Sequence, residues 1–126
     1  MKTIFHCPQC DQAVTRPLEP LPAGKEICHT DGLPAVPEGY FAASVDDYWT
    51  GSVGCTLVNL QDLVGTRYHP FASRNNGCCG RDGVSGPNLL CAAGHEIGTE
   101  RSDCWMTHAA VLKKDIGAKQ IADTSR

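Results

Sequence analysis

The segment Cys7-Pro8-Gln9-Cys10 places two thiols two residues apart near the start of the chain. On a tight turn, two thiolates at this spacing reach one tetrahedral zinc ion, with Zn–S bonds of about 2.3 Å. The same spacing also serves thiol–disulfide chemistry, which usually requires a helix N-terminus to lower a thiol pKa. Here the pair follows an expected strand, and Pro17 excludes a long helix after it. We therefore favour a structural metal knuckle over a redox pair.

One knuckle supplies two ligands, and the best partner for it is the segment Cys91-Ala92-Ala93-Gly94-His95. It offers a thiolate and an imidazole on either side of a small, flexible turn. Together with Cys7 and Cys10 these residues would make a Cys3His zinc site, although 80 residues separate the two halves. The alternative is a buried Cys91 thiol and a surface His95. Metal binding to such a site contributes about 10–16 kcal/mol, as much as the stability of a whole domain.

A second group of possible ligands comprises His69, Cys78, Cys79, Cys104 and His108. If the segment 104–108 is helical, Cys104 and His108 lie on one face at positions i and i+4. Adjacent cysteines tend to point apart, so we expect Cys79 to join Cys104, His108 and His69 in a second site. Cys78 would then belong to the core or to the first site. The alternative is that all of these are packed thiols and ordinary histidines.

Catalysis has weaker support in the sequence. Either of the adjacent cysteines could pair with His69 or His108 as an activated nucleophile. A zinc ion with three protein ligands and an open position is the other enzymatic route, with Asp82 or Glu96 as base. Spacing does not bring these groups together, so we expect a protein that is not an enzyme.

The composition indicates the compartment and the partners. Eight cysteines in 126 residues would form four disulfides in a secreted protein, but the N-terminal residues do not resemble a signal peptide. We therefore expect a cytoplasmic protein that binds Zn2+ at one structural site, with a second site as a further option. The net charge is −3 and no long apolar run is present, so we expect a protein partner rather than nucleic acid or a membrane.

The elements that must position these residues are short, because Gly and Pro together account for 21 residues. Turn residues and apolar alternation predict a short strand that enters a turn over 4–10, and strands over 12–15, 40–45, 55–60, 88–91 and 96–99. Leu57, Leu60, Leu63 and Val64 could instead lie on one face of a short helix, and Asn59 could cap a helical turn from Leu60 to Val64. Ser102 or Asp103 could cap a helical turn over 104–108. We expect Cys28 and Cys55 to be buried small residues, and most of the larger aromatics to lie in the core: Tyr40, Tyr48, Trp49 and Trp105.

The segment from Asn76 to Trp105, with its Gly-Cys-Cys-Gly centre and its Gly94-His95-Glu96 turn, resembles an uncharacterised family of small bacterial zinc-ribbon-like proteins. The resemblance covers mainly residues 57–108, and it implies a cytoplasmic metal-binding domain without a known activity. We therefore expect a small α+β or mainly β fold with short strands and long loops. Residues 1–114 would form a single zinc-stabilised domain, and residues 115–126 a loosely packed tail.

Overall fold

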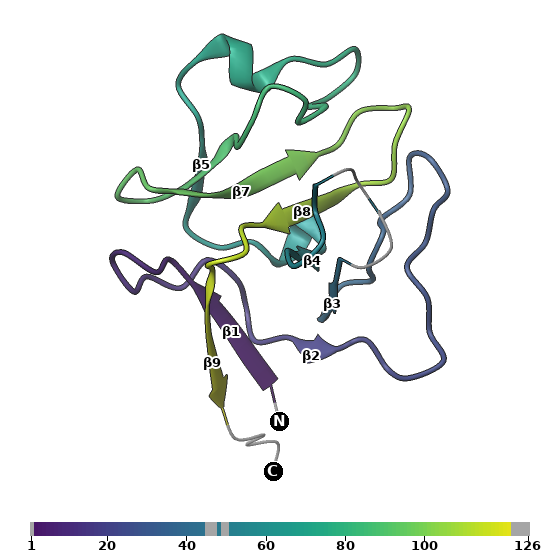
Figure 1. Ribbon diagram of the computed structural model, residues 1–126, viewed down its shortest axis with the longest axis vertical. Helices are drawn as coiled ribbons and strands as arrows, with labels where there is room; N and C mark the ends of the chain where they lie inside the picture. The colour runs from purple at the N-terminus through teal and green to yellow at the C-terminus, as the bar shows by residue number, and fades with distance from the viewer. Residues whose placement is uncertain (1, 45–47, 49–50, 122–126) are drawn as a thin grey trace.

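The protein is mainly β, and its centre is one seven-stranded sheet (Figure 1). The computed structural model describes residues 2–44, 48 and 51–121. The strand order is β2-β3-β4-β8-β7-β6-β5. All neighbouring pairs are antiparallel except the short parallel pair of β2 and β3 at one edge. The strands are β2 (Glu19–Pro20), β3 (Tyr40–Ala43), β4 (Thr56–Val58), β5 (Thr66–Tyr68), β6 (Leu89–Cys91), β7 (Glu96–Arg101) and β8 (Ala109–Leu112).

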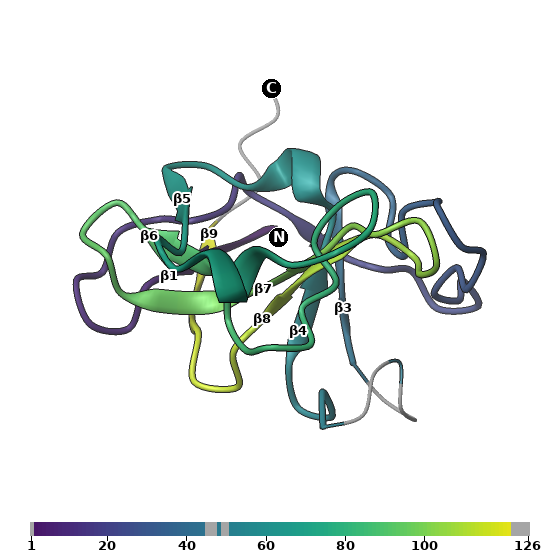
Figure 2. The ribbon, with the colours of Figure 1, turned by 90° about the horizontal axis from the view of Figure 1, so that it is seen from above.

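The N-terminal segment forms a separate layer. Strand β1 (Lys2–His6) pairs along its whole length with β9 (Gly117–Ile121), and the two strands lie side by side in Figures 1 and 2. On its other edge β1 meets residues 13 and 18 through isolated bridges. Part of the expected C-terminal tail is therefore a strand of this layer. Residues 122–126 lie outside the described part of the chain.

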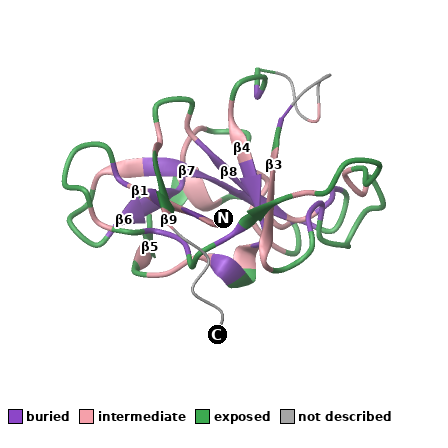
Figure 3. Ribbon diagram, turned by 90° about the horizontal axis from the view of Figure 1, so that it is seen from below, coloured by how far each residue is buried: buried purple, intermediate pink, exposed green. Residues whose placement is uncertain are grey.

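The central strands β4 and β8 are covered on both faces, and successive side chains enter two different cores. Val58 and Leu112 pack with Phe5 of the N-terminal layer. Leu57 and Val111 pack on the opposite face, together with Val36 from the loop before β3. This alternation follows from the pleat of a strand, which sends neighbouring side chains to opposite faces. Burial is greatest along β4, β6, β7 and β8, whereas β2, most of β9 and much of the connecting loops are exposed (Figure 3).

The hairpin of β6 and β7 has a polar anchor at its open end. The side chain of Asn88 is fully buried, accepts a hydrogen bond from the Glu100 N–H at 2.6 Å and donates to the Glu100 carbonyl at 3.1 Å. The Asn88 side chain thereby pairs with both backbone polar groups of Glu100 at the end of the hairpin, as a neighbouring strand would. Because a slip by one residue would leave this buried amide without partners, Asn88 holds the register of the hairpin.

Short 3-10 turns replace most of the expected helix. Asn59 accepts a hydrogen bond from the Gln61 N–H at 2.8 Å and so caps η1 (Leu60–Asp62), as the sequence predicts. A second turn, η2 (Ala72–Asn75), lies in the long loop before β6. In the part of the chain that the structure describes, no helix is long and apolar enough to cross a membrane.

The structure confirms a mainly β fold of short strands and long loops, including strands near 40–45, 55–60, 88–91 and 96–99. The expected helix over 104–108 is wrong, because this segment is a turn that leads directly into β8. The aromatic prediction holds in part. Tyr40 and Tyr48 pack against a core, Trp105 is 53% exposed, and Trp49 lies outside the described residues.

The central position of β8 predicts the cost of truncating its buried leucine. Leu112 is fully buried between β4 and β7, so Leu112→Ala should lower the free energy of unfolding by about 2–5 kcal/mol. Leu33 is half exposed, and Leu33→Ala should change the free energy of unfolding by no more than about 0.5 kcal/mol. Urea unfolding of the metal-loaded protein measures both values. Equal effects of the two substitutions would contradict this position for β8.

Candidate metal centres

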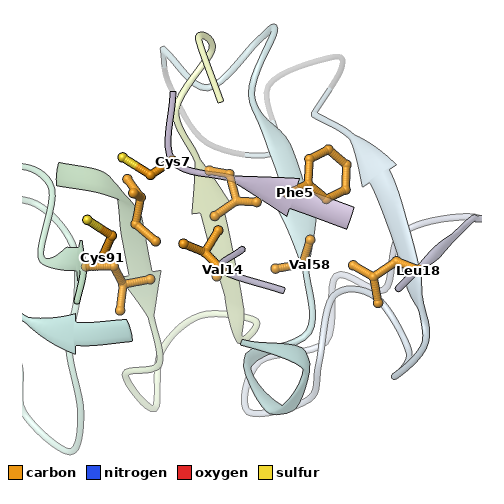
Figure 4. Packing of buried hydrophobic residues seen from close by; sticks show 10 residues of the cluster. Phe5, Cys7, Val14, Leu18, Val58 and Cys91 are labelled. Atoms are coloured by element: carbon orange, nitrogen blue, oxygen red, sulfur yellow. The ribbon is translucent and has the colours of Figure 1, made fainter. Parts of the chain in front are cut away.

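Two pairs of donor residues, separated by 80 residues of sequence, meet at one end of the core that contains Phe5, Val58 and Leu112. The potential ligand atoms of Cys7, Cys10, Cys91 and His95 all lie within 4.8 Å of one another. The Sγ atoms of Cys10 and Cys91 are 3.7 Å apart, and His95 Nδ1 lies 3.6 Å from Cys7 Sγ and 3.4 Å from Cys91 Sγ. In Figure 4 the sulfur atoms of Cys7 and Cys91 lie close together at the end of the core opposite Leu18.

These distances match the edges of a metal-centred tetrahedron. With Zn–S bonds of about 2.3 Å and a Zn–N bond of about 2.0–2.1 Å, the S–S edges are about 3.8 Å and the S–N edges about 3.6 Å. Three thiols and one imidazole are also a donor set typical of structural zinc. The four residues could therefore hold one ion in a closed shell, with no position left for water or substrate.

The first pair of donors is held by the turn that ends β1. The Cys7 N–H donates to the Gln12 carbonyl at 2.9 Å, and the Asp11 N–H returns to the Cys7 carbonyl at 2.9 Å. Asp11 adopts a positive φ of 63°, which reverses the chain after Cys10. This conformation turns both thiols toward the sheet, with Cys7 fully buried and Cys10 exposed.

The second pair is held by the turn between β6 and β7. Cys91 is the last residue of β6 and its backbone pairs with His95, directly before β7. Gly94 closes this turn with φ of 94°, a conformation that favours glycine. Burial opposes ionisation of Cys91, but the N–H groups of His95 and Ala93 and the adjacent Cys10 and His95 side chains lower its pKa to about 6. The fold thus favours the thiolate form that a metal requires.

A second cluster consists of Cys78, Cys79 and Cys104, whose sulfur atoms also lie within 4.8 Å of one another. The sulfur atoms of the adjacent pair are 3.8 Å apart. All three residues are exposed, in contrast to Cys7 and Cys91. A hydrogen bond with Cys79 contributes most to raising the pKa of Cys104 to about 12, followed by desolvation, the charge of Cys79 and the contact with the Asp103 carboxylate.

The buried carboxylate of Asp103 organises the second cluster. It accepts hydrogen bonds from the backbone N–H groups of Cys78, Cys79 and Cys104 at 2.8–2.9 Å, and from Trp105 Nε1 at 2.9 Å. The N–H groups of Cys79 and Cys78, ahead of those of Cys104 and Trp105, hold the pKa of Asp103 far below its usual range. One carboxylate thereby binds together two loops that are separate in the sequence.

Two of the expected second-site ligands lie elsewhere. His69 Nδ1 accepts from the Phe71 N–H at 3.1 Å and its Nε2 lies 3.6 Å from a Glu96 carboxylate oxygen. His108 Nε2 lies 3.1 Å from the backbone carbonyl of Asp103. Because residues 104–108 form a turn rather than a helix, the i, i+4 relation between Cys104 and His108 does not apply. The cluster joins Cys79 and Cys104, as expected, but with Cys78 in place of both histidines.

The role of Cys78 was missed because adjacent side chains usually diverge. Gly77 and Gly80 allow the exception, since a Cβ atom on Gly77 would lie 1.7 Å from the Gly80 carbonyl oxygen. The two glycines flanking the paired cysteines were the available signal. The role of Asp103 was also missed, because it was considered only as a helix cap. Cys28 and Cys55 are partly buried rather than fully buried.

Comparison with known proteins adds no relative. No protein-family model, no curated protein and no solved structure matches the chain. The two clusters therefore have to be interpreted from their own geometry.

Because Asp103 accepts four hydrogen bonds, we predict that its negative charge is needed to hold the loop of residues 77–81 in place. Asp103→Asn places an NH2 group against backbone donors, so it should lower the melting temperature and increase the hydrogen exchange of residues 77–81. The matched control is Asp115→Asn, since Asp115 is exposed and should have no effect on either measurement. Unchanged exchange at 77–81 in Asp103→Asn would show that the carboxylate does not hold the loop.

Proposed function

We propose that the protein is a cytoplasmic zinc-binding protein in which Cys7, Cys10, Cys91 and His95 hold one structural Zn2+. The observation that carries this proposal is the set of S–S and S–N distances of 3.4–3.7 Å, which correspond to the edges of a zinc-centred tetrahedron. All eight cysteines are free thiols, a state that a reducing compartment maintains. The resemblance to small bacterial zinc-ribbon-like proteins is part of the same proposal.

A structural role also follows from what the ion would connect. Cys7 and Cys10 belong to the N-terminal layer, whereas Cys91 and His95 belong to the β6–β7 hairpin of the main sheet. One ion would therefore cross-link two layers whose shared core includes Cys7 and Cys91 themselves. A closed shell of four protein ligands is typical of structural zinc, whereas catalytic zinc keeps an open position.

We further propose that the domain is a module for recognising another protein. Phe71 is 63% exposed and Tyr68 is 48% exposed, and both line a hollow of about 530 Å³. The same hollow includes Gly94 of the metal-binding turn, so the proposed zinc site would hold one of its walls in place. Exposed aromatic residues around a shaped hollow are typical of protein-binding surfaces.

The alternative is a zinc-dependent or cysteine-dependent enzyme. The exposed thiols of the second cluster favour it, because three ligands leave a coordination position open, whereas the first cluster offers four. The contacts of His69 and His108 with other groups weaken it, since neither ring belongs to the cluster of thiols.

The zinc proposal predicts a metal-dependent fold. The purified protein should contain zinc, and a strong chelator should abolish cooperative thermal unfolding, because the site contributes about as much free energy as the domain possesses. Cys91→Ser should lose this zinc and unfold at a much lower temperature. Cys28→Ser is the matched control, since Cys28 is a partly buried thiol outside both clusters, and should retain both properties. A metal-free, fully reduced protein that melts at the same temperature would refute the proposal.

The surface proposal predicts that one aromatic side chain decides partner binding. A partner is first captured from cell extract on the wild-type chain, and its direct binding to that chain is then shown with both proteins purified. Phe71→Ser should abolish this binding. Leu33→Ser changes a similarly exposed apolar residue outside the hollow and should retain that partner. Equal binding by both variants would contradict a role for this surface.

A further inference from the structure

In the part of the chain that the structure describes, no fourth potential ligand joins the three exposed thiols outside the first cluster. Among the described residues, the group contains Cys78, Cys79 and Cys104 and no histidine or carboxylate. Both oxygens of Asp103 face N–H donors instead. We propose that these three cysteines form a second, solvent-open metal site, which binds a soft monovalent cation of the Cu(I) type through three thiolates.

The spacing of the sulfur atoms suits three-coordinate binding. With metal–sulfur bonds of about 2.3 Å, a trigonal site has S–S edges of about 4 Å. The Cys78 and Cys79 sulfur atoms are 3.8 Å apart, and Cys104 lies within 4.8 Å of both. Because Cys104 is exposed, its side chain has room to adjust to the edge length that an ion sets.

The backbone under the cluster is organised before any ion binds. The Ser102 N–H donates to the Arg81 carbonyl at 2.7 Å, and Ser102 Oγ accepts from the Arg81 N–H at 3.1 Å. A Cβ atom on Gly80 would lie 2.3 Å from the Ser102 carbonyl oxygen, so the two loops touch through their backbones. With Asp103 joining the same loops, the three thiols are presented without a large cost in conformational entropy.

The donor set selects the class of ion. Thiolates alone favour soft ions such as Cu(I), whereas structural zinc almost always takes four protein ligands. The ion stays in one oxidation state, so no electrons are transferred. Three S–H bonds give way to three metal–sulfur bonds, and the protons pass to the solvent.

Exposure distinguishes this site from the first. Two of the four donors of the first centre, Cys7 and Cys91, are fully buried, whereas all three thiols of the second cluster are exposed. An incoming thiol from another molecule can therefore reach the ion directly and replace one ligand at a time. The second site is thus built for exchange of its ion, and it does not depend on the zinc proposal for the first.

The test is a competition titration of the zinc-loaded, fully reduced full-length protein with Cu(I), held without oxygen by a chromophoric chelator. The wild-type chain should take up one Cu(I) and release no zinc. Cys104→Ser should weaken Cu(I) binding at least tenfold while retaining its zinc and its melting temperature. Cys28→Ser, the matched control, should bind Cu(I) as the wild type does. X-ray absorption at the copper edge should show sulfur neighbours alone.

Several outcomes would overturn the assignment. Equal Cu(I) affinity in Cys104→Ser and the wild type would exclude the cluster as the site. Cu(I) uptake that expels an equal amount of zinc would place the ion at the first centre. A second zinc held in preference to Cu(I) would refute the class of ion. In another outcome, the wild-type protein contains no zinc but binds Cu(I), and Cys104→Ser does not bind Cu(I). That result would support the second site and refute the zinc proposal.

Discussion

The convergence of Cys7, Cys10, Cys91 and His95 is the constraint on which the rest of the molecule depends. The first two residues end β1 in the N-terminal layer, and the other two flank the turn of the β6–β7 hairpin. Backbone hydrogen bonds hold each pair of residues in a local turn. Folding then has to bring the two layers together for the four donors to meet. An ion bound by all four donors would cross-link positions that are distant along the chain, where closing a loop costs the most entropy.

The first cluster of potential metal ligands and the apolar core form one unit. Cys7 and Cys91 are fully buried members of the cluster that also contains Phe5, Val58 and Leu112. The hydrophobic contacts bring the thiols together, and the thiols complete one end of the core (Figure 4). The second core, on the opposite face of β4 and β8, contains no residue of either metal cluster. The two faces of the central strands therefore differ, because one core ends at the four potential metal ligands and the other consists of packed side chains.

A carboxylate organises the second cluster in the way that the core organises the first. Asp103 satisfies four N–H donors from two loops that have little regular structure, and it leaves the adjacent thiols facing solvent. Buried polar groups that are fully hydrogen-bonded specify one arrangement, because any other arrangement leaves donors unsatisfied. The glycine-rich loop around Cys78 and Cys79 is thus held by hydrogen bonds to Asp103, together with those between Ser102 and Arg81.

Local patterns in the sequence were sufficient for strands β1, β3, β4, β6 and β7, the Asn59 cap and the two pairs of donors that the first cluster brings together. Each of these depends on residues a few positions apart, such as the Cys7–Cys10 spacing or the Gly94 turn. The strand β8, the pairing of β9 with β1, and the contact of Cys78 with Cys104 were decided by the tertiary structure. The helical pattern at 104–108 failed for the same reason: Asp103 draws its neighbours' N–H groups into a turn, and the chain then joins the sheet as β8. Contacts between distant residues depend on how the layers pack, and no local spacing contains that information.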